Sequence, residues 1–89
     1  MTILIDPPLW PAHGTVFSHL VSDVSYVELH TFAASTGLPE RAFDRDHYDV
    51  PLARYAGLVA AGALEVPSRE LLFRLIDAGL RLRRGQRHT

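Results

Sequence analysis

Two hydrophobic periods run along this chain of 89 residues, one typical of strands and one typical of helices. Short apolar, β-branched runs predict strands, while apolar residues spaced three and four positions apart predict helices. The predicted strands are 3–5, 16–21, 47–50 and 64–66. The predicted helices run from Ser25 to about Thr36, from Pro51 to Ala61 and from Ser68 to about Ala78, with a helical turn over 39–43.

Capping residues set the ends of these helices. Ser25 and Glu28 form a capping box, in which each side chain bonds the backbone N–H of the other residue. Ser68 is predicted to cap the last helix through its hydroxyl, and a glycine follows each helix, as it commonly does. Strands that alternate with helices predict a single α/β domain over residues 1–79, with a sheet of about four short, at least partly parallel strands and three main helices.

The composition indicates a small globular protein. The chain is 47% hydrophobic and 21% charged, which is typical of a folded domain. It contains no cysteine, which excludes disulfides, thiolate zinc sites, iron–sulfur ligation and a thiol nucleophile. A chain of this length buries only about 60–65% of its unfolded surface. That thin core favours a homodimer.

The apolar segments are too short for a membrane protein. No stretch approaches the roughly 20 apolar residues that span a bilayer. The first six residues carry no basic side chain, and their apolar run is too short for a signal peptide. We therefore expect no membrane segment and a cytoplasmic location.

Charge is distributed unevenly along the chain. All ten acidic residues and five of the nine arginines lie in residues 1–79, whereas residues 80–89 hold four arginines and no acid. We expect residues 80–89 to form a frayed basic tail. Nucleic acid is not expected as a partner except through phosphate contacts of this tail. The alternative interpretation of the whole chain is a non-catalytic interaction module that binds a protein or nucleic acid through the tail.

Histidine and aspartate residues provide the candidate chemistry. On a strand over 47–50, His47 and Asp49 share one face and Tyr48 lies on the other, where it is expected in the core. His19 lies on one face of the second predicted strand. Two imidazoles and one carboxylate predict a site for a divalent metal (Zn, Mn, Fe or Ni), with His19, His47 and Asp49 as ligands. Such a metal would turn bound water into a hydrolytic nucleophile.

Two further residues complete the predicted catalytic set. Asp23 follows the second strand, and His30 lies on the first helix. Either side chain is a candidate base, or a group that orients a metal ligand. The predicted site is therefore lined by His19, Asp23, His30, His47 and Asp49.

These residues are also compatible with two roles that need no metal. In the first, the residues are structural: Asp49 and Asp23 cap the helices that follow them, and His30 bonds to the backbone. In the second, the site binds a small anionic ligand through the helix N-terminus at Pro51 and nearby arginines. Trp10 is expected either to cover the open end of the core or to form an aromatic platform over the site.

A series of short motifs resembles a known family. The motifs are Ile-Asp-Pro-Pro-Leu-Trp-Pro-Ala-His-Gly, Ser-His-Leu-Val-Ser-Asp, Glu-Leu-His-Thr-Phe-Ala, His-Tyr-Asp-Val and Ala-Gly-Ala, in this order. Over about residues 2–79 the chain resembles the small bacterial and phage family catalogued as domain of unknown function 4031. The resemblance implies a prokaryotic origin and a site built from Asp6, His19, Asp23, Glu28, His30, His47, Tyr48 and Asp49. It implies no particular activity.

The residues therefore support a hypothesis about chemistry. The favoured function is metal-assisted hydrolysis of a phosphoester or a related bond, or the binding of a small anionic ligand. No serine lies in a Gly-x-Ser-x-Gly turn that would indicate a serine hydrolase.

Overall fold

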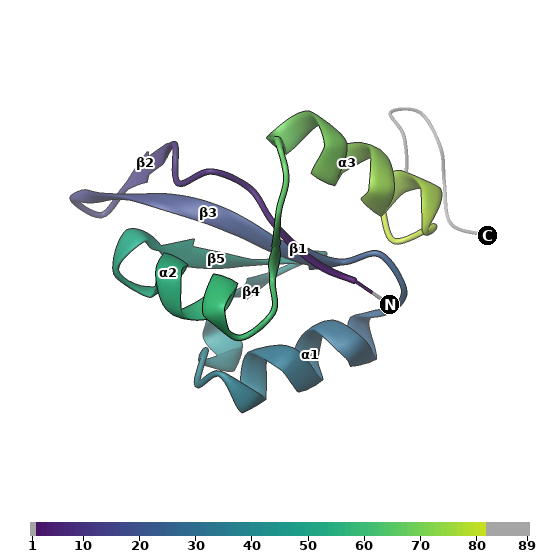
Figure 1. The fold of residues 1–89 in the computed structure, drawn as a ribbon, viewed down its shortest axis with the longest axis horizontal. Coiled ribbons are helices and arrows are strands. Elements are labelled where there is room, and N and C mark those ends of the chain that lie inside the picture. Colours follow the sequence, from purple (N-terminus) through teal and green to yellow (C-terminus); the bar gives the residue numbers. More distant parts are fainter. Residues whose placement is uncertain (1, 82–89) are drawn as a thin grey trace.

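The computed structural model describes residues 2–81. These residues form one sheet and three α-helices (Figure 1). The strands are β1 (Ile3–Ile5), β2 (Trp10–Ala12), β3 (Thr15–Ser22), β4 (Phe43–Asp44), β5 (His47–Pro51) and β6 (Leu64–Glu65). The helices are α1 (Tyr26–Ser35), α2 (Leu52–Ala60) and α3 (Ser68–Asp77), with a 3₁₀ turn η1 (Glu40–Ala42) before β4.

The sheet is mixed and centred on the long strand β3. Its order is β4-β5-β3-β1-β6, and β2 pairs with the first part of β3. β1 pairs with β6 in parallel, and the other pairs are antiparallel. The predicted α/β class with a partly parallel sheet is thus confirmed.

Two short strands differ from the predictions. Trp10–Ala12 was expected to be a loop but forms strand β2. Phe43 was expected to end a helical turn but begins strand β4. Pro11 cannot donate to a ladder, but an edge strand tolerates it. The β2–β3 hairpin closes through His13 and Gly14, with φ of 48° and 77°. Two positive φ values fit the twist of a tight hairpin, so tertiary pairing outweighed the loop-like composition.

The helix caps agree with the sequence only in part. The Ser25 side chain accepts from the Glu28 N–H, as predicted. The other half of the capping box was wrong, because the Glu28 carboxylate accepts from the Ser22 hydroxyl instead. The predicted cap at Ser68 was also wrong, since Ser68 is the first residue of α3 and its hydroxyl donates to Asp6.

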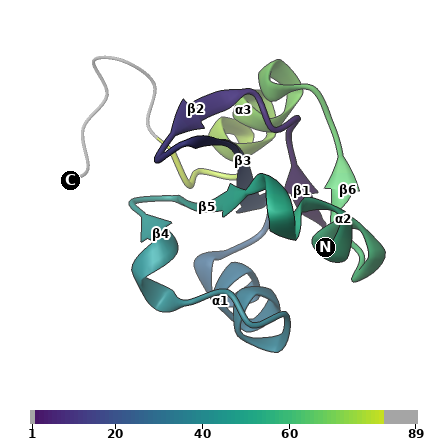
Figure 2. The ribbon, with the colours of Figure 1, turned by 90° about the vertical axis from the view of Figure 1, so that its left-hand side faces the viewer.

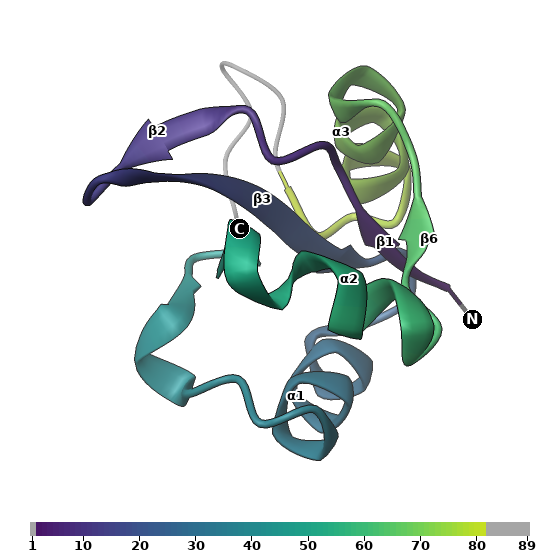
Figure 3. The same cartoon turned by 60° about the vertical axis from the view of Figure 1, so that its left-hand side comes forward.

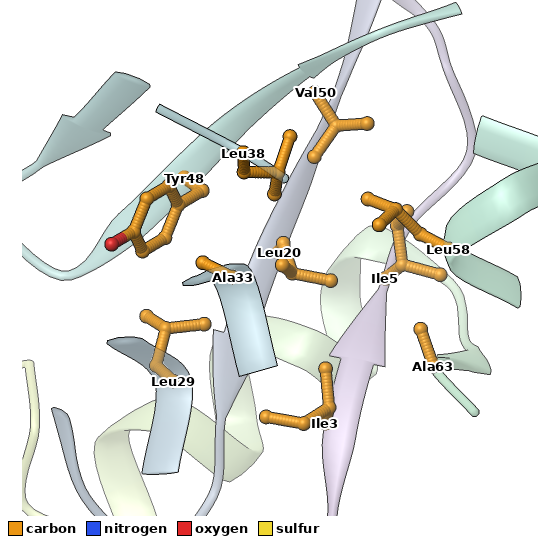
Figure 4. Close-up of a cluster of buried hydrophobic side chains, with 10 residues drawn as sticks. All are labelled: Ile3, Ile5, Leu20, Leu29, Ala33, Leu38, Tyr48, Val50, Leu58 and Ala63. Atoms are coloured by element: carbon orange, nitrogen blue, oxygen red, sulfur yellow. The ribbon is translucent and has the colours of Figure 1, made fainter. Parts of the chain in front are cut away.

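One face of the sheet carries the larger core. Helices α1 and α2 pack on this face (Figure 2). Figure 4 shows side chains of α1 and α2 meeting those of β1, β3 and β5. The buried residues are Ile3, Ile5, Leu20, Leu29, Ala33, Leu38, Tyr48, Val50, Leu58 and Ala63.

Within residues 2–81, α3 is the helix that covers the opposite face. Leu71 and Leu75 of α3 pack with Leu4, Val21 and Val66 into a smaller cluster. Figure 3 shows β2 and the first half of β3 extending beyond α3. Part of this face is therefore left without a covering helix.

The chain continues to contact the fold after α3. Leu80 packs against the smaller cluster, and its carbonyl accepts a hydrogen bond from the Tyr26 hydroxyl. Arg81 pairs with Asp46. The rest of the predicted tail, residues 82–89, lies outside the described residues. Within residues 2–81, the helices are all too short or too polar to cross a membrane.

Candidate metal centre

Strand pairing brings His19, His47 and Asp49 together on the face that carries α3. His19 lies opposite Asp49 in the β3–β5 ladder, and His47 shares the face of Asp49 because it is two residues away. The ligand atoms of the three side chains lie within 4.8 Å of one another. His47 Nε2 is 3.1 Å from an Asp49 carboxylate oxygen, and the two imidazole centroids are 4.9 Å apart. The predicted cluster is therefore present.

His19 is held by the buried carboxylate of Asp6. Asp6 directly follows β1 and is 0% exposed. Its Oδ2 atom is 2.9 Å from Nδ1 of His19. Its other oxygen accepts from the His19 backbone N–H at 2.6 Å. Because Nδ1 is engaged, Nε2 is the ring nitrogen of His19 that remains available as a ligand. Nε2 has no hydrogen-bond partner within residues 2–81.

Asp6 accepts two further hydrogen bonds, one from the nearby Trp10 and one from the distant Ser68. The Ser68 hydroxyl donates to Oδ2 at 2.8 Å, and the Trp10 indole N–H donates to the same oxygen at 3.4 Å. Burial raises the pKa of Asp6, but hydrogen bonds from His19 and Ser68 outweigh it and hold the pKa below its usual value. The hydrogen bond to Asp6 in turn raises the pKa of His19, although burial opposes this. Asp6 is therefore an ionised acceptor that orients His19.

His47 is held in the same way by Asp46. The Asp46 carboxylate lies 2.8 Å from His47 Nδ1. Arg81 donates to both Asp46 oxygens, at 2.6 and 2.9 Å. Burial raises the pKa of Asp46, but Arg81 and then His47 lower it below its usual value. Arg45, with a φ of 62°, forms the β4–β5 turn that leads into Asp46.

The two aspartate–histidine pairs share one geometry. In each, a carboxylate contacts Nδ1 and leaves Nε2 available, and Nε2 of His47 faces Asp49. Carboxylates hold metal-binding histidines in this manner, which sets the tautomer and raises ligand basicity. Neither Asp6 nor Asp46 was predicted from strand geometry as an orienting residue. The available signals were the family pattern at Asp6 and the position of Asp46 next to His47.

Two residues of the predicted catalytic set lie elsewhere. His30 projects from α1 toward the opposite face of the sheet, where its Nδ1 lies 2.7 Å from the Tyr48 hydroxyl. Asp23 accepts from the Thr2 backbone N–H at 3.0 Å, and Arg74 lies 3.6 Å away. The carboxylates that contact the clustered histidines are therefore those of Asp6 and Asp46, and neither His30 nor Asp23 contacts them.

The structural roles considered for these residues are met unevenly. Asp49 does not cap α2, whose N-cap is Pro51 with no side-chain hydrogen bond. Tyr48 is 2% exposed and belongs to the larger core, as predicted. Trp10 is 47% exposed and belongs to neither core cluster. Its ring centroid lies 5.2 Å from that of His19, so Trp10 stands beside the cluster.

The cluster opens to solvent through two hollows. A groove of about 440 Å³ runs between the cluster and α3. A smaller hollow of about 160 Å³ touches His19, Asp49 and Trp10 from the side of the β2–β3 hairpin. The side chains of His19, His47 and Asp49 are 27%, 14% and 45% exposed. The groove is lined by Asp6, Trp10, His19, Val21, His47, Ser68, Arg69, Leu71, Leu72 and Arg81.

Fold and cluster together define a class of protein. The chain is a small α/β domain with two carboxylate-held histidines and a third carboxylate in an open cluster. The family model described as "Protein of unknown function (DUF4031)" matches residues 3–78. The chain therefore belongs to this family, as the resemblance predicted. Comparisons with curated proteins and with solved structures gave no match.

Proposed function

We propose that His19, His47 and Asp49 bind a divalent metal ion (Zn, Mn, Fe or Ni), and that the bound metal hydrolyses a phosphoester. The observation that carries this proposal is the repeated geometry of the two histidines. Each has its Nδ1 held by a carboxylate, which leaves Nε2 as the ring nitrogen available to a metal. Nε2 of His47 lies 3.1 Å from the Asp49 carboxylate. Two imidazoles and one carboxylate suit these metals.

The spacing of the donors supports a single ion. Metal–ligand bonds of about 2.0–2.2 Å place neighbouring donors about 3–4 Å apart. His47 Nε2 and the Asp49 oxygen are already 3.1 Å apart. The whole set lies within 4.8 Å, so a small rotation of His19 would complete the site.

The charges around His47 also favour a cation. Its Nδ1 faces Asp46 and its Nε2 faces Asp49. A metal ion at Nε2 would offset the charge of Asp49 and leave the Nδ1–H of His47 to donate to Asp46. The two carboxylates that flank this one ring therefore give a negative environment that suits a cation at Nε2.

Three protein ligands leave coordination positions for water and substrate. A bound metal lowers the pKa of its water toward about 7, so hydroxide is available near neutral pH. That hydroxide would attack phosphorus, the ester P–O bond would break, and the released alcohol oxygen would take a proton from solvent. Asp6 and Asp46 act as positioning residues, because they hold the ligand rings and do not touch the substrate.

Metal binding is tested by elemental analysis before and after treatment with a chelator. We expect about one metal ion per chain, lost with the chelator, and a higher melting temperature when it is restored. His19→Gln, His47→Gln and Asp49→Asn should each lose the ion. His30→Gln is the matched control, because His30 lies on the opposite face. Absence of a metal and of any melting shift with Zn, Mn, Fe or Ni overturns the proposal.

Hydrolysis is tested separately with a chromogenic aryl phosphate. The metal-loaded protein should release the phenol, and both chelation and Asp49→Asn should abolish the release. A chain that binds metal but releases no phenol, from either a phosphate monoester or a diester, overturns the hydrolytic part of the proposal.

A further inference from the structure

We infer that the groove between Trp10 and α3 binds a phosphate ester that carries a planar aromatic group, of which a nucleoside monophosphate is the common cellular form. The inference names a substrate class for the metal centre and therefore rests on the proposed function. Three features carry it: an exposed and fixed indole, an apolar opposite wall, and the balance of charge within the groove.

The indole of Trp10 is both exposed and held in place. It is 47% exposed although tryptophan is usually largely buried. Its N–H donates to the buried Asp6 carboxylate, and its ring is tilted by 59° against the His19 ring. An aromatic face held in this way is a stacking platform for a planar ring of a ligand. Because Trp10 lies against His19, a ligand ring stacked on the indole would lie next to the metal ligands.

The opposite wall of the groove is apolar. Leu71 and Leu72 of α3 line it together with Val21, and Leu72 remains 37% exposed. The groove volume of about 440 Å³ lies within the range of about 300–1,000 Å³ typical of small-molecule sites. A planar ring between Trp10 and Leu72 would remove both apolar surfaces from water.

The acids in the groove and beside it already have partners, which leaves positive charge for a phosphate. Asp6 is saturated by its donors, and Asp46 is paired with Arg81 and His47. Asp49 becomes a metal ligand in the proposed function. Arg69, on the first turn of α3, forms no ion pair within residues 2–81. Arg69 lines the same groove as His19 and His47, so its guanidinium would be available to a phosphate bound at the metal.

These features separate the two ends of the ligand. The phosphate would lie at the metal and Arg69, and the ring would lie on Trp10, so the scissile ester bond falls between them. Water would supply the oxygen that joins phosphorus, the ester oxygen would leave with a proton, and the products would be a nucleoside and inorganic phosphate.

Fluorescence measures this binding directly, because Trp10 is the single tryptophan of the chain. The metal-loaded protein is titrated with adenosine 5′-monophosphate, adenosine, ribose 5-phosphate and inorganic phosphate. We expect saturable quenching by the monophosphate, and binding about 5- to 100-fold weaker for ribose 5-phosphate, which has no aromatic base to stack. A dinucleotide with a terminal phosphate distinguishes a free nucleotide from the end of a nucleic-acid strand.

Two variants, followed by calorimetry, assign the two ends. Trp10→Leu should remove the preference for adenosine monophosphate over ribose 5-phosphate. Arg69→Gln should weaken both phosphates and leave adenosine unchanged. Arg41→Gln is the matched control, because Arg41 is an exposed arginine of η1 that does not line the groove.

The outcomes separate this inference from the proposed function. If the protein binds metal and hydrolyses the aryl phosphate, yet binds adenosine monophosphate no more tightly than ribose 5-phosphate, the inference is overturned and the proposed function stands. If no metal binds under any condition, the proposed function fails first, whatever the nucleotide titration gives.

Discussion

The two faces of the sheet carry different chemistry although the same strands form both. On β5, Tyr48 and Val50 are 2% and 0% exposed beneath α1 and α2, whereas the side chains of His47 and Asp49 are 14% and 45% exposed on the other face. Helices α1 and α2 pack on the first face, and α3 covers part of the second. Core residues and residues of the His/Asp cluster therefore alternate along β5.

The histidines of the two faces show what this difference does. His30, on the covered side, contacts a neutral phenol, while His19 and His47 on the open side contact carboxylates. A buried carboxylate is costly unless several donors hydrogen-bond to it. Asp6 accepts such hydrogen bonds from residues of β2, β3 and α3. The open face is thus an organised polar network within a thin domain.

The largest expected effect comes from breaking the covered face alone. Leu20→Ala should lower the free energy of unfolding by about 2–5 kcal/mol, because Leu20 is fully buried and truncation leaves a cavity. Asp49→Asn should change it by no more than about 0.5 kcal/mol in metal-free protein. Urea denaturation of both variants measures the contrast. Equal losses would show that the two faces are not independent.

A smaller loss of stability is expected from a change at Asp6, which is buried although it belongs to the network of the open face. Asp6→Asn keeps the shape but places an amide NH₂ against groups that donate to the carboxylate. We expect a loss of about 1–3 kcal/mol in unfolding free energy and a metal affinity lower by about 10- to 100-fold. Denaturation and metal titration of the same preparation test this. An unchanged metal affinity would contradict the orienting role of Asp6.

The smallest effect concerns ionisation of the tyrosines. Burial raises the pKa of all three tyrosines, and burial followed by the Glu65 contact raises the pKa of Tyr55 to about 12. The fold favours the neutral phenol of Tyr55. Its contribution to stability is therefore complete below the ordinary tyrosine pKa of 10.0 and is lost as the pH rises through about 12.

Absorbance of the phenolate measures this titration in folded and denatured protein. We expect the folded protein to ionise later than the denatured chain, and Tyr55→Phe to remove the step at the highest pH. Ionisation of all three phenols near pH 10 in the folded protein would contradict the burial that the structure assigns to them.

Several features could be predicted because they depend on neighbouring residues. Alternation along a strand places His47 and Asp49 on one face and Tyr48 on the other, and the Ser25 cap begins α1 where the local pattern indicates. The short strands β2 and β4 could not be predicted in this way. Their residues resemble a loop and a turn, and only their pairing with β3 and β5 makes them strands.

The amino-acid sequence by itself determined the α/β class, the main elements and the separation of His47 and Asp49 from Tyr48, because these follow from periodicities of a few residues. Only the tertiary structure decided that His19 lies opposite Asp49 and that Asp6 meets His19, Trp10 and Ser68. It also decided that His30 faces away from the cluster. Contacts between segments far apart depend on strand register and on which face each helix covers, and no local pattern specifies either.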